Sequence, residues 1–220
     1  MPRTNKNFES RKEQLIQLAL EQFIKKGYED TTITDLQNSF GLTKGGMYHY
    51  FSSKEEILDA VIEYGLGQGI KGLIEELEQI PLEKKLIYFF FSNTTNAFTK
   101  NIFMYSRSNR SSIVTYRLRE KTLKMLIPIL RNIMNQSIKS GFYKSEYSNE
   151  MAEFSIILAQ AITEEGMLPE VDLAHKKKRM DALLDMWCKC VEPPAEHIHE
   201  LKINLYKLIS TEENLGNEGV

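Results

Sequence analysis

The segment from Thr32 to Lys54 gathers, within a short stretch of chain, side chains that can contact a nucleic acid. Lys44, Tyr48 and His49 offer a cation and polar aromatic groups that lie on one face of a helix, and Thr43 is suited to cap that helix. Such groups bind phosphate oxygens and the polar edges of bases in a DNA groove. The pattern therefore favours the binding of a duplex.

Two glycines stand in the same predicted helix, at Gly45 and Gly46, and each costs about 1 kcal/mol there relative to Ala. Without side chains, they let backbone amides near the helix N-terminus approach a phosphate or a base edge. Met47, Tyr50 and Phe51 recur at spacings of three and four and are expected to point inward. The helix therefore combines a polar outer face with an apolar inner face.

Helix signals surround this segment on both sides. Gly27 is placed to end a first helix, Thr32 and Asp35 form a capping box for a second, and Gly41 ends that second helix. Ser53 begins a fourth helix, which precedes Pro81. The other patterns predict helices at 8–26, 33–40, 44–50, 82–98, 101–109, 111–139, 148–166, 173–191 and 195–210.

The predicted fold class is all-α, because no alternating stretch is long enough for a strand. Tight connections make residues 1–54 a three-helix helix-turn-helix head, followed by a larger helical body at 55–211 and a frayed tail at 212–220. The head carries eight basic and six acidic residues, whereas the remainder carries twenty and twenty-four. That asymmetry has the sign expected of a basic DNA-reading head.

Composition and motifs exclude several other classes. There is no run of about 18 apolar residues and the N-terminus is polar, so we expect a cytoplasmic protein without a membrane span. The pairs Glu75-Glu76 and Glu164-Glu165 diverge around a helix, and no nucleophile constellation or phosphate loop is present. We therefore expect no enzyme and no cofactor.

A metal site is a weaker alternative near the C-terminus. Cys188, Cys190, His197, His199 and Glu200 are potential ligands, but residues two apart do not face each other on a helix. The favoured interpretation is a solvated helix face and a pair of free thiols, so we expect no metal.

The head resembles TetR-type transcriptional repressors, and the stretch TKGGMYHYFSSKEEIL is very similar to that family's signature. The likeness covers about the first sixty residues. The matching positions are Ala19, Phe23, Gly27, Tyr28, Thr32, Thr34, Asp35, Gly41, Leu42, Thr43, Lys44, Gly45, Tyr48, Tyr50, Phe51, Lys54, Glu55, Leu58 and Val61. Gln37, Phe40 and Gly46 depart from the pattern, which usually has small residues at the first two positions and Thr, Ala or Ser at the third.

The resemblance implies a role for each matching position. Thr34 and Thr43 correspond to hydroxyls that contact phosphates, and Lys44 and Gly45 lie where base edges are approached. Tyr48 and His49 match contacts to phosphates or thymine methyl groups. Lys54 resembles a phosphate anchor.

The resemblance also implies a ligand-responsive regulator, namely a repressor that binds a palindromic operator as a homodimer and is released by a small molecule. An alternative is a helical ligand-binding or dimerisation protein with lost or altered DNA binding, suggested by the three departures. The sequence does not distinguish a repressor from an activator.

The body supplies candidates for the dimer interface, the effector site and a hinge. Residues at helical spacing that could pair across a two-fold axis, or lie buried inside one protomer, are Phe154, Ile157, Leu158, Ala161, Leu183, Leu184 and Trp187. Candidates for contact with a largely apolar effector are Tyr88, Phe91, Asn93, Asn96, Phe103, Tyr105, Met125 and Met134. The fourth helix contains Gly65, Gly67, Gly69 and Gly72, which favour either a soft hinge or close helix packing.

Overall fold

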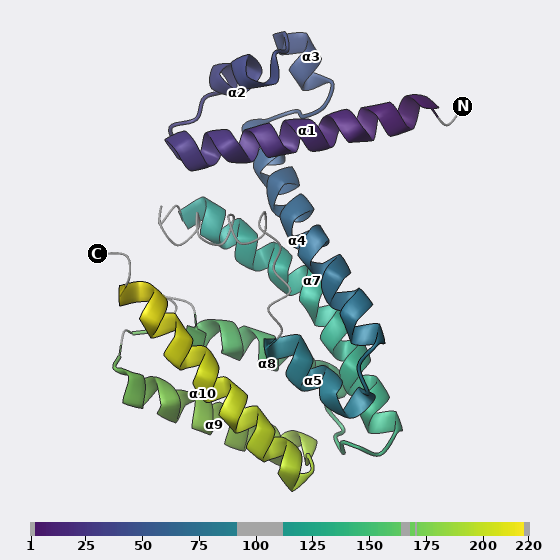
Figure 1. Ribbon diagram of the computed structural model, residues 1–220, viewed down its shortest axis with the longest axis vertical. Helices are drawn as coiled ribbons and strands as arrows, with labels where there is room; N and C mark the ends of the chain where they lie inside the picture. Colours follow the sequence, from purple (N-terminus) through teal and green to yellow (C-terminus); the bar gives the residue numbers. More distant parts are fainter. Residues whose placement is uncertain (1–2, 92–111, 164–167, 170, 218–220) are drawn as a thin grey trace. The chain divides into compact units, whose positions relative to one another are not determined.

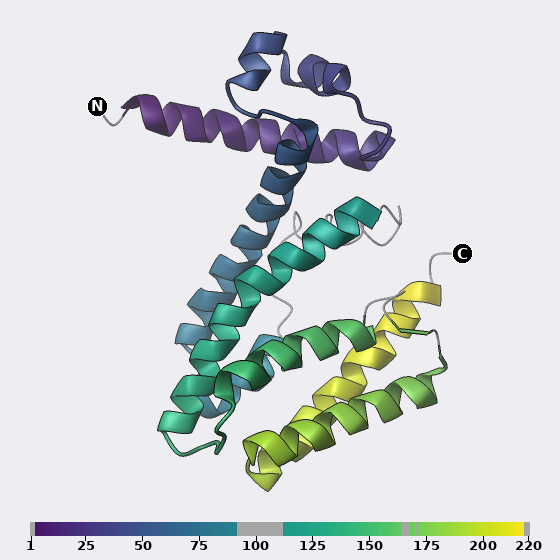
Figure 2. The ribbon, with the colours of Figure 1, turned by 180° about the vertical axis from the view of Figure 1, so that it is seen from behind.

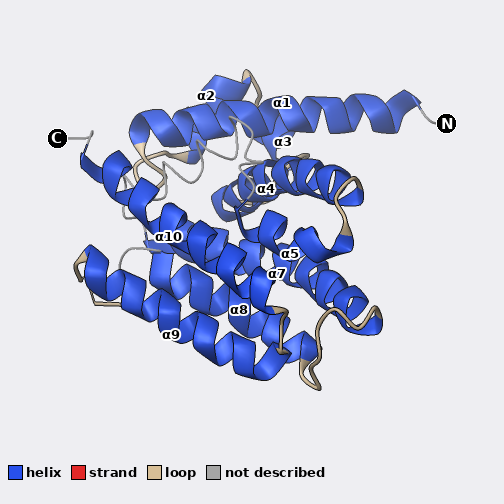
Figure 3. Cartoon of the chain, turned by 60° about the horizontal axis from the view of Figure 1, so that its bottom comes forward, coloured by secondary structure: helices blue, strands red, loops and turns tan. Residues whose placement is uncertain are grey.

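The computed structural model describes residues 3–91, 112–163, 168–169 and 171–217. Every regular element in those ranges is a helix, which confirms the all-α prediction (Figure 3). None of these helices has a stretch of 18 residues apolar enough to cross a membrane. The helices are α1 Arg3–Lys26, α2 Ile33–Phe40, α3 Lys44–Tyr48, α4 Lys54–Glu78, α5 Leu82–Phe91, α7 Ser112–Lys139, α8 Ser148–Thr163, α9 Leu173–Val191 and α10 Ala195–Asn217.

The predicted helices at 33–40 and 173–191 are confirmed at both ends. Helix α3 ends at Tyr48 rather than Tyr50, because the chain tightens into a turn in which the Tyr50 and Phe51 amides both donate to the Met47 carbonyl. The predicted helix at 101–109 and the last part of the one at 82–98 lie outside the described residues.

The chain forms two compact units. Unit 1 comprises residues 1–72 and 94–122, and unit 2 comprises residues 73–93 and 123–220, so α4 and α7 contribute to both. In unit 1, α2 and α3 lie on one side of α1 (Figure 1). The apolar stripe of α1 packs there with inward residues of the next helices, all almost completely buried: Leu15, Ala19, Phe23, Leu36, Phe40, Met47, Phe51, Ile57 and Leu58.

Ion pairs join the parts of α4 and α7 that belong to unit 1. Arg117 donates to Asp59 at 2.8 Å, and Lys121 donates to Glu63 at 2.5 Å. All four side chains keep some exposure to solvent, so each pair contributes at most about 1 kcal/mol to stability. Their effect is mainly to hold these parts of α4 and α7 together.

Unit 2 packs α5, α8, α9 and α10 around a single apolar core. Helix α9 contacts both α8 and α10, and Figure 2 shows the three helices from behind. Tyr143 and Trp187 meet edge to face in this core, at a ring distance of 5.5 Å. His197 is buried beside them, and a hydrogen bond of 2.7 Å joins its Nδ1 to the Tyr143 hydroxyl.

Candidate nucleic-acid interface

The start of α2 is fixed by the capping box that the sequence predicts. The Thr32 side chain accepts a hydrogen bond from the Asp35 amide at 3.1 Å, and the Asp35 carboxylate accepts one from the Thr32 amide at 2.8 Å. Lys26 donates to the same carboxylate at 2.6 Å. These hydrogen bonds from Lys26 and Thr32 hold the pKa of Asp35 well below its usual range. The carboxylate thereby ties the start of α2 to the last turn of α1.

The turn between α2 and α3 depends on one left-handed residue. Gly41 has φ 62° and ψ 33°, a conformation that is costly for side chains with a Cβ, and its amide donates to the Asn38 carbonyl. Thr43 then caps α3, because its side chain accepts a hydrogen bond of 3.2 Å from the Gly46 amide. Two short helices joined by this tight turn make the helix-turn-helix arrangement that the sequence predicts.

Helix α3 has the two faces expected of a recognition helix. Met47 is fully buried, and Phe51 just beyond the helix is 1% exposed. On the opposite side Lys44, Gly45 and His49 are exposed, and Tyr48 has 47% of its surface accessible. The polar groups therefore face solvent while the apolar groups hold the helix in place.

The two glycines of α3 are not required for packing inside the protein. A Cβ at Gly45 would meet no atom within 4 Å, and one at Gly46 would lie at ordinary contact distance, 3.4 Å, from the Thr43 hydroxyl oxygen. Alanine would therefore fit at both positions and favour the helix by about 1 kcal/mol at each. Because the two glycines have no side chains, another molecule can approach the backbone of α3 closely at these positions.

An aromatic contact that the sequence analysis missed braces the end of α3 against α1. Phe8 stacks on Tyr50 with ring centres 4.8 Å apart and planes inclined by 14°. His49 meets Phe8 edge to face at 5.4 Å. Tyr50, expected to point inward, is half-buried in this contact. Phe8 and Tyr50 are 42 positions apart, so no local spacing signals their pairing.

A hollow of about 420 Å³ opens between the N-termini of α2 and α4. Its lining includes the hydroxyls of Thr32, Tyr48, Ser52 and Ser53, of which the sequence analysis proposed only Tyr48 as a contact. Helix N-termini and hydroxyl groups are common donors to phosphate oxygens, although the Thr32 and Ser52 hydroxyls here already donate to the carboxylates of Asp35 and Glu56. The missed hydroxyls had a usable signal, because each lies at or next to a predicted helix start.

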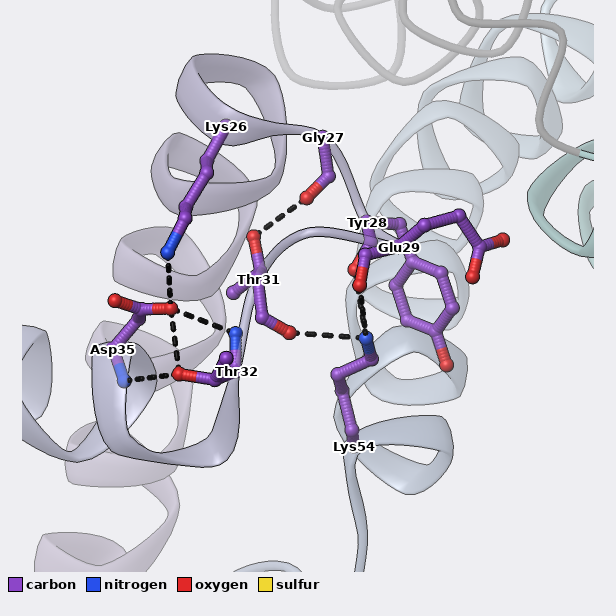
Figure 4. A network of polar contacts seen from close by, with 8 residues as sticks. All are labelled: Lys26, Gly27, Tyr28, Glu29, Thr31, Thr32, Asp35 and Lys54. Atoms are coloured by element: carbon purple, nitrogen blue, oxygen red, sulfur yellow. Dashed lines mark hydrogen bonds and ion pairs between the residues drawn. The ribbon is translucent and has the colours of Figure 1, made fainter.

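The other predicted contact residues lie in the same unit but in different settings. Thr34 is exposed on α2, and Thr43 is exposed although its hydroxyl also caps α3. Lys54 begins α4 and borders the hollow, but its ammonium group donates to backbone carbonyls of the turn between α1 and α2 (Figure 4). The structure thus brings Thr43, Lys44, Gly45, Tyr48 and His49 together on or beside α3.

The family comparison matches this part of the chain. Residues 15–61, which include α2, α3 and the turn between them, match the model described as bacterial regulatory proteins of the tetR family. Over these residues the chain is similar to the TetR family of bacterial regulatory proteins.

Two curated TetR-family relatives share the head. An uncharacterised HTH-type transcriptional regulator of Bacillus subtilis, YfiR, is 36% identical over 75 residues, which cover 34% of this chain and 37% of that protein. The transcriptional repressor KstR2 of Mycolicibacterium smegmatis is 40% identical over 53 residues, 24% of this chain and 26% of that protein. The chain therefore spans 37% and 26% of the lengths of these two relatives.

A solved structure extends the likeness to the whole fold. A TetR-family regulator from Syntrophomonas wolfei matches with a TM-score of 0.58 at 24% identity, over 81% of this chain and 93% of that one. At that identity the likeness concerns the fold, which is the N-terminal helix-turn-helix followed by a helical body.

The head accommodates Phe40, where the family pattern usually has a small residue, by burying its ring. Phe40 is 2% exposed and lies 6.5 Å, ring to ring, from Phe51. Its backbone carbonyl accepts a hydrogen bond of 3.2 Å from Arg11 of α1. The larger side chain thus fills space beneath α2 and α3 and leaves the exposed face of α3 unchanged.

The effector candidates separate in the structure. Tyr88 and Phe91 line a cavity of about 370 Å³ in unit 2, together with Ile80, Pro81, Lys84, Ile87 and Glu200. Met125 is half-buried, and Met134 is 1% exposed in the core of unit 2. The remaining candidates, Asn93, Asn96, Phe103 and Tyr105, lie outside the described residues.

The dimer candidates fall on both faces of their helices. On α8, Phe154 is 51% and Ile157 40% exposed, while Leu158 and Ala161 are half-buried. On α9, Leu183 is half-buried, whereas Leu184 and Trp187 are each 6% exposed and belong to the core of the same protomer. Met186 of α9, which the sequence analysis passed over, is 43% exposed.

The potential metal ligands near the C-terminus do not form a cluster of three in the part of the chain that the structure describes. His197 is directed into the core towards Tyr143, and Cys188 and Cys190 are free and half-buried. Burial raises the pKa of the Cys188 thiol, which keeps that group protonated and poorly suited to bind a metal.

Proposed function

We propose that the chain is a non-enzymatic transcriptional regulator that binds a palindromic DNA operator as a homodimer and is released from it by a small molecule. The head at residues 1–54 reads the operator, and the body at 55–211 binds the effector and the second copy. The observation that carries this proposal is the exposed polar face of α3 above the buried Met47, inside the region that matches the family.

In the proposed complex α3 enters the major groove, which is about 12 Å wide and admits one helix. Lys44 and Gly45 approach base edges because they occupy the exposed first turn of α3. Tyr48 and His49 contact phosphates or thymine methyl groups. The hydroxyls of Thr34 and Thr43 contact the backbone on either side of the groove and fix the register of the head on the duplex.

Dimerisation through α8 and α9 is supported by their exposed apolar side chains. Phe154 and Ile157 lie one helical turn apart on α8, and Met186 adds an exposed apolar group on the neighbouring α9. Exposed apolar side chains on neighbouring helices are typical of a protein–protein interface. We retain Leu158, Ala161 and Leu183 at its half-buried edge and omit Leu184 and Trp187, since the protomer core already buries them.

Effector binding is proposed for unit 2, at the cavity that Tyr88 and Phe91 line. Its walls are mostly apolar, with the ammonium of Lys84 and the carboxylate of Glu200 as polar groups. Such a lining suits a largely apolar molecule with a polar end. A ligand acts on DNA binding only if it prefers the conformation that does not bind the operator.

Selection of DNA from a random duplex library with the wild-type chain tests the proposal. We expect recovery of a palindromic sequence and a gel shift whose affinity falls steeply with salt, since phosphate contacts release counterions. The double variant Lys44→Ala/Tyr48→Ala should lose the shift, whereas Lys144→Ala in unit 2 should retain it. Recovery of no duplex, even at low salt, would favour the alternative of a helical ligand-binding or dimerisation protein with lost DNA binding.

A further inference from the structure

Lys54, the first residue of α4, reaches back across the head to the turn that follows α1. Its Nζ donates to the carbonyl oxygens of Tyr28 at 2.8 Å, Thr31 at 3.0 Å and Glu29 at 3.2 Å (Figure 4). The same Nζ lies 4.3 Å from the centre of the Tyr28 ring. One ammonium group thus donates to three backbone carbonyls of a single turn.

That turn needs donors because the chain leaves helical geometry there. Gly27 has φ 89°, and the Thr31 side chain and amide both donate to the Gly27 carbonyl, at 2.6 and 3.2 Å. The Tyr28 carbonyl also accepts from the Thr31 amide, at 3.3 Å, and the carbonyls of Tyr28, Glu29 and Thr31 all lie close to the Lys54 ammonium at the start of α4 (Figure 4). Partly buried carbonyl groups require partners, and Lys54 supplies them.

The donors of Lys54 are fully used in this arrangement. A lysine ammonium has three N–H bonds, and three carbonyl oxygens lie within 3.2 Å of it. A cation is also disfavoured at the N-terminus of its own helix and favoured beyond the C-terminus of another, here α1. Both facts indicate that the side chain serves the turn rather than an outside anion.

We propose that Lys54 is a positioning residue: its side chain fastens the α1–α2 turn to the first turn of α4 and does not contact a DNA phosphate. This inference rests on the proposed function. Thr32, which follows the turn directly, caps α2 and lines the hollow between the two helix starts. Fastening the turn therefore sets where α2 and the hydroxyls of the hollow stand relative to a duplex.

The variant Lys54→Arg separates positioning from phosphate contact. Arginine keeps the charge and binds phosphates at least as well as lysine, but its planar fork cannot present one nitrogen to three converging carbonyls. With the duplex recovered by selection as the probe, we expect Lys54→Arg to bind at least about tenfold more weakly, as expected from losing one charge-assisted hydrogen bond. Lys144→Arg, at an exposed lysine of unit 2 outside the proposed reading surface, is the matched control.

The salt dependence of binding gives a second measure. Lys54→Met keeps an unbranched apolar side chain but removes the ammonium that lies over the Tyr28 ring. The slope of log affinity against log salt should then stay as in the wild type, whereas loss of a lysine that neutralises one phosphate would lower it by about 0.9 per head. A wild-type affinity for Lys54→Arg, together with a slope reduced by about 0.9 per head for Lys54→Met, would overturn the proposal and assign Lys54 to a phosphate.

Hydrogen exchange tests the fastening without any DNA. In the free protein, Lys54→Met and Lys54→Arg should speed exchange of the Thr31 amide about tenfold, because the turn opens more readily, and Lys44→Met should not. Unchanged exchange in both Lys54 variants would refute the fastening, even if the wild-type chain binds no duplex. Failure of the inference is thus distinguishable from failure of the proposed function.

Discussion

Helix α4 should become more stable when Gly67 and Gly72 are both replaced by alanine. Both residues lie inside the helix, and a Cβ built at either position meets no atom within 4 Å. The substitutions therefore add no steric conflict and remove the backbone freedom that glycine has in the unfolded chain. Close helix packing, one of the two explanations considered for these glycines, does not account for this pair.

The expected gain follows from helix propensity. Alanine is favoured over glycine in a helix interior by about 1 kcal/mol, so the pair should add about 2 kcal/mol. The two effects should be additive because neither added methyl group touches another side chain. For a chain of this size, about 1 kcal/mol shifts the melting temperature by about 2–4 °C, which gives about 4–8 °C for the double variant.

Thermal unfolding followed by circular dichroism at fixed protein concentration measures this shift. Gly41→Ala is the control, because φ is 62° there and a side chain should destabilise the turn by about 1–2 kcal/mol. If Gly67→Ala/Gly72→Ala melts at or below the wild-type temperature, the two positions are constrained by contacts and the argument from open space is wrong. A clear gain leaves the soft hinge as the remaining explanation for glycine at these positions.

Three further perturbations test the cap of α2, the core of unit 2 and the dimer face. Thr32→Ala should lower the free energy of unfolding by about 1 kcal/mol in urea titrations, because α2 loses its N-cap. Burial lowers the pKa of His197, so the folded state favours the neutral ring. The contribution of this neutral ring to the free energy of unfolding should be fully present above about pH 6.5, the ordinary pKa of His, and should decline below it. Melting curves of His197→Gln should show a smaller decline. Phe154→Glu/Ile157→Glu should give monomers in sedimentation velocity, since two carboxylates replace the exposed apolar groups of α8.

Distinct results would contradict each of these expectations. An unchanged urea midpoint for Thr32→Ala would mean that water caps α2 equally well. A decline below pH 6.5 that persists in His197→Gln would place the responsible group elsewhere. Dimers that survive two glutamates at Phe154 and Ile157 would exclude that face of α8 from the interface.

The head was predictable because its signals are local. The Thr32–Asp35 box, Gly41 and the Thr43 cap each act on residues no more than four positions away, so their spacing alone predicts α2, the turn and α3. The exposed face of α3 follows once Met47 is assigned to the core. Local helix signals and tertiary packing favour the same conformation in this segment, so the sequence pattern is sufficient to predict most of its structure.

The missed features depend on contacts that are distant in sequence. Phe8 meets Tyr50 across 42 positions, and Lys54 meets the carbonyl of Tyr28 across 26. A motif shows that a lysine stands at the start of α4, but not which acceptors its side chain finds. Backbone carbonyls carry no sequence signal at all, so this role became visible only with the turn in three dimensions.

The body was harder to interpret because helical spacing alone does not separate an interface from a core. Trp187 and Met186 are adjacent on α9, yet one lies in the core of the protomer and the other is exposed. Both satisfy an apolar pattern when the helix is read from sequence. Only the contacts that α9 makes with α8 and α10 show which of its sides is already covered.

The proposed reading surface is a property of the whole head rather than of α3 itself. A helix of five residues with two glycines has almost no stability in isolation, because the first helical turn is entropically costly to form and so short a helix makes few hydrogen bonds to offset that cost. Thr43 caps its start, Met47 anchors its middle in the core, and Phe8 braces the residues after its end through Tyr50. Substitutions at these three buried or capping positions should therefore disturb DNA binding as surely as changes at Lys44, although none of them reaches a base.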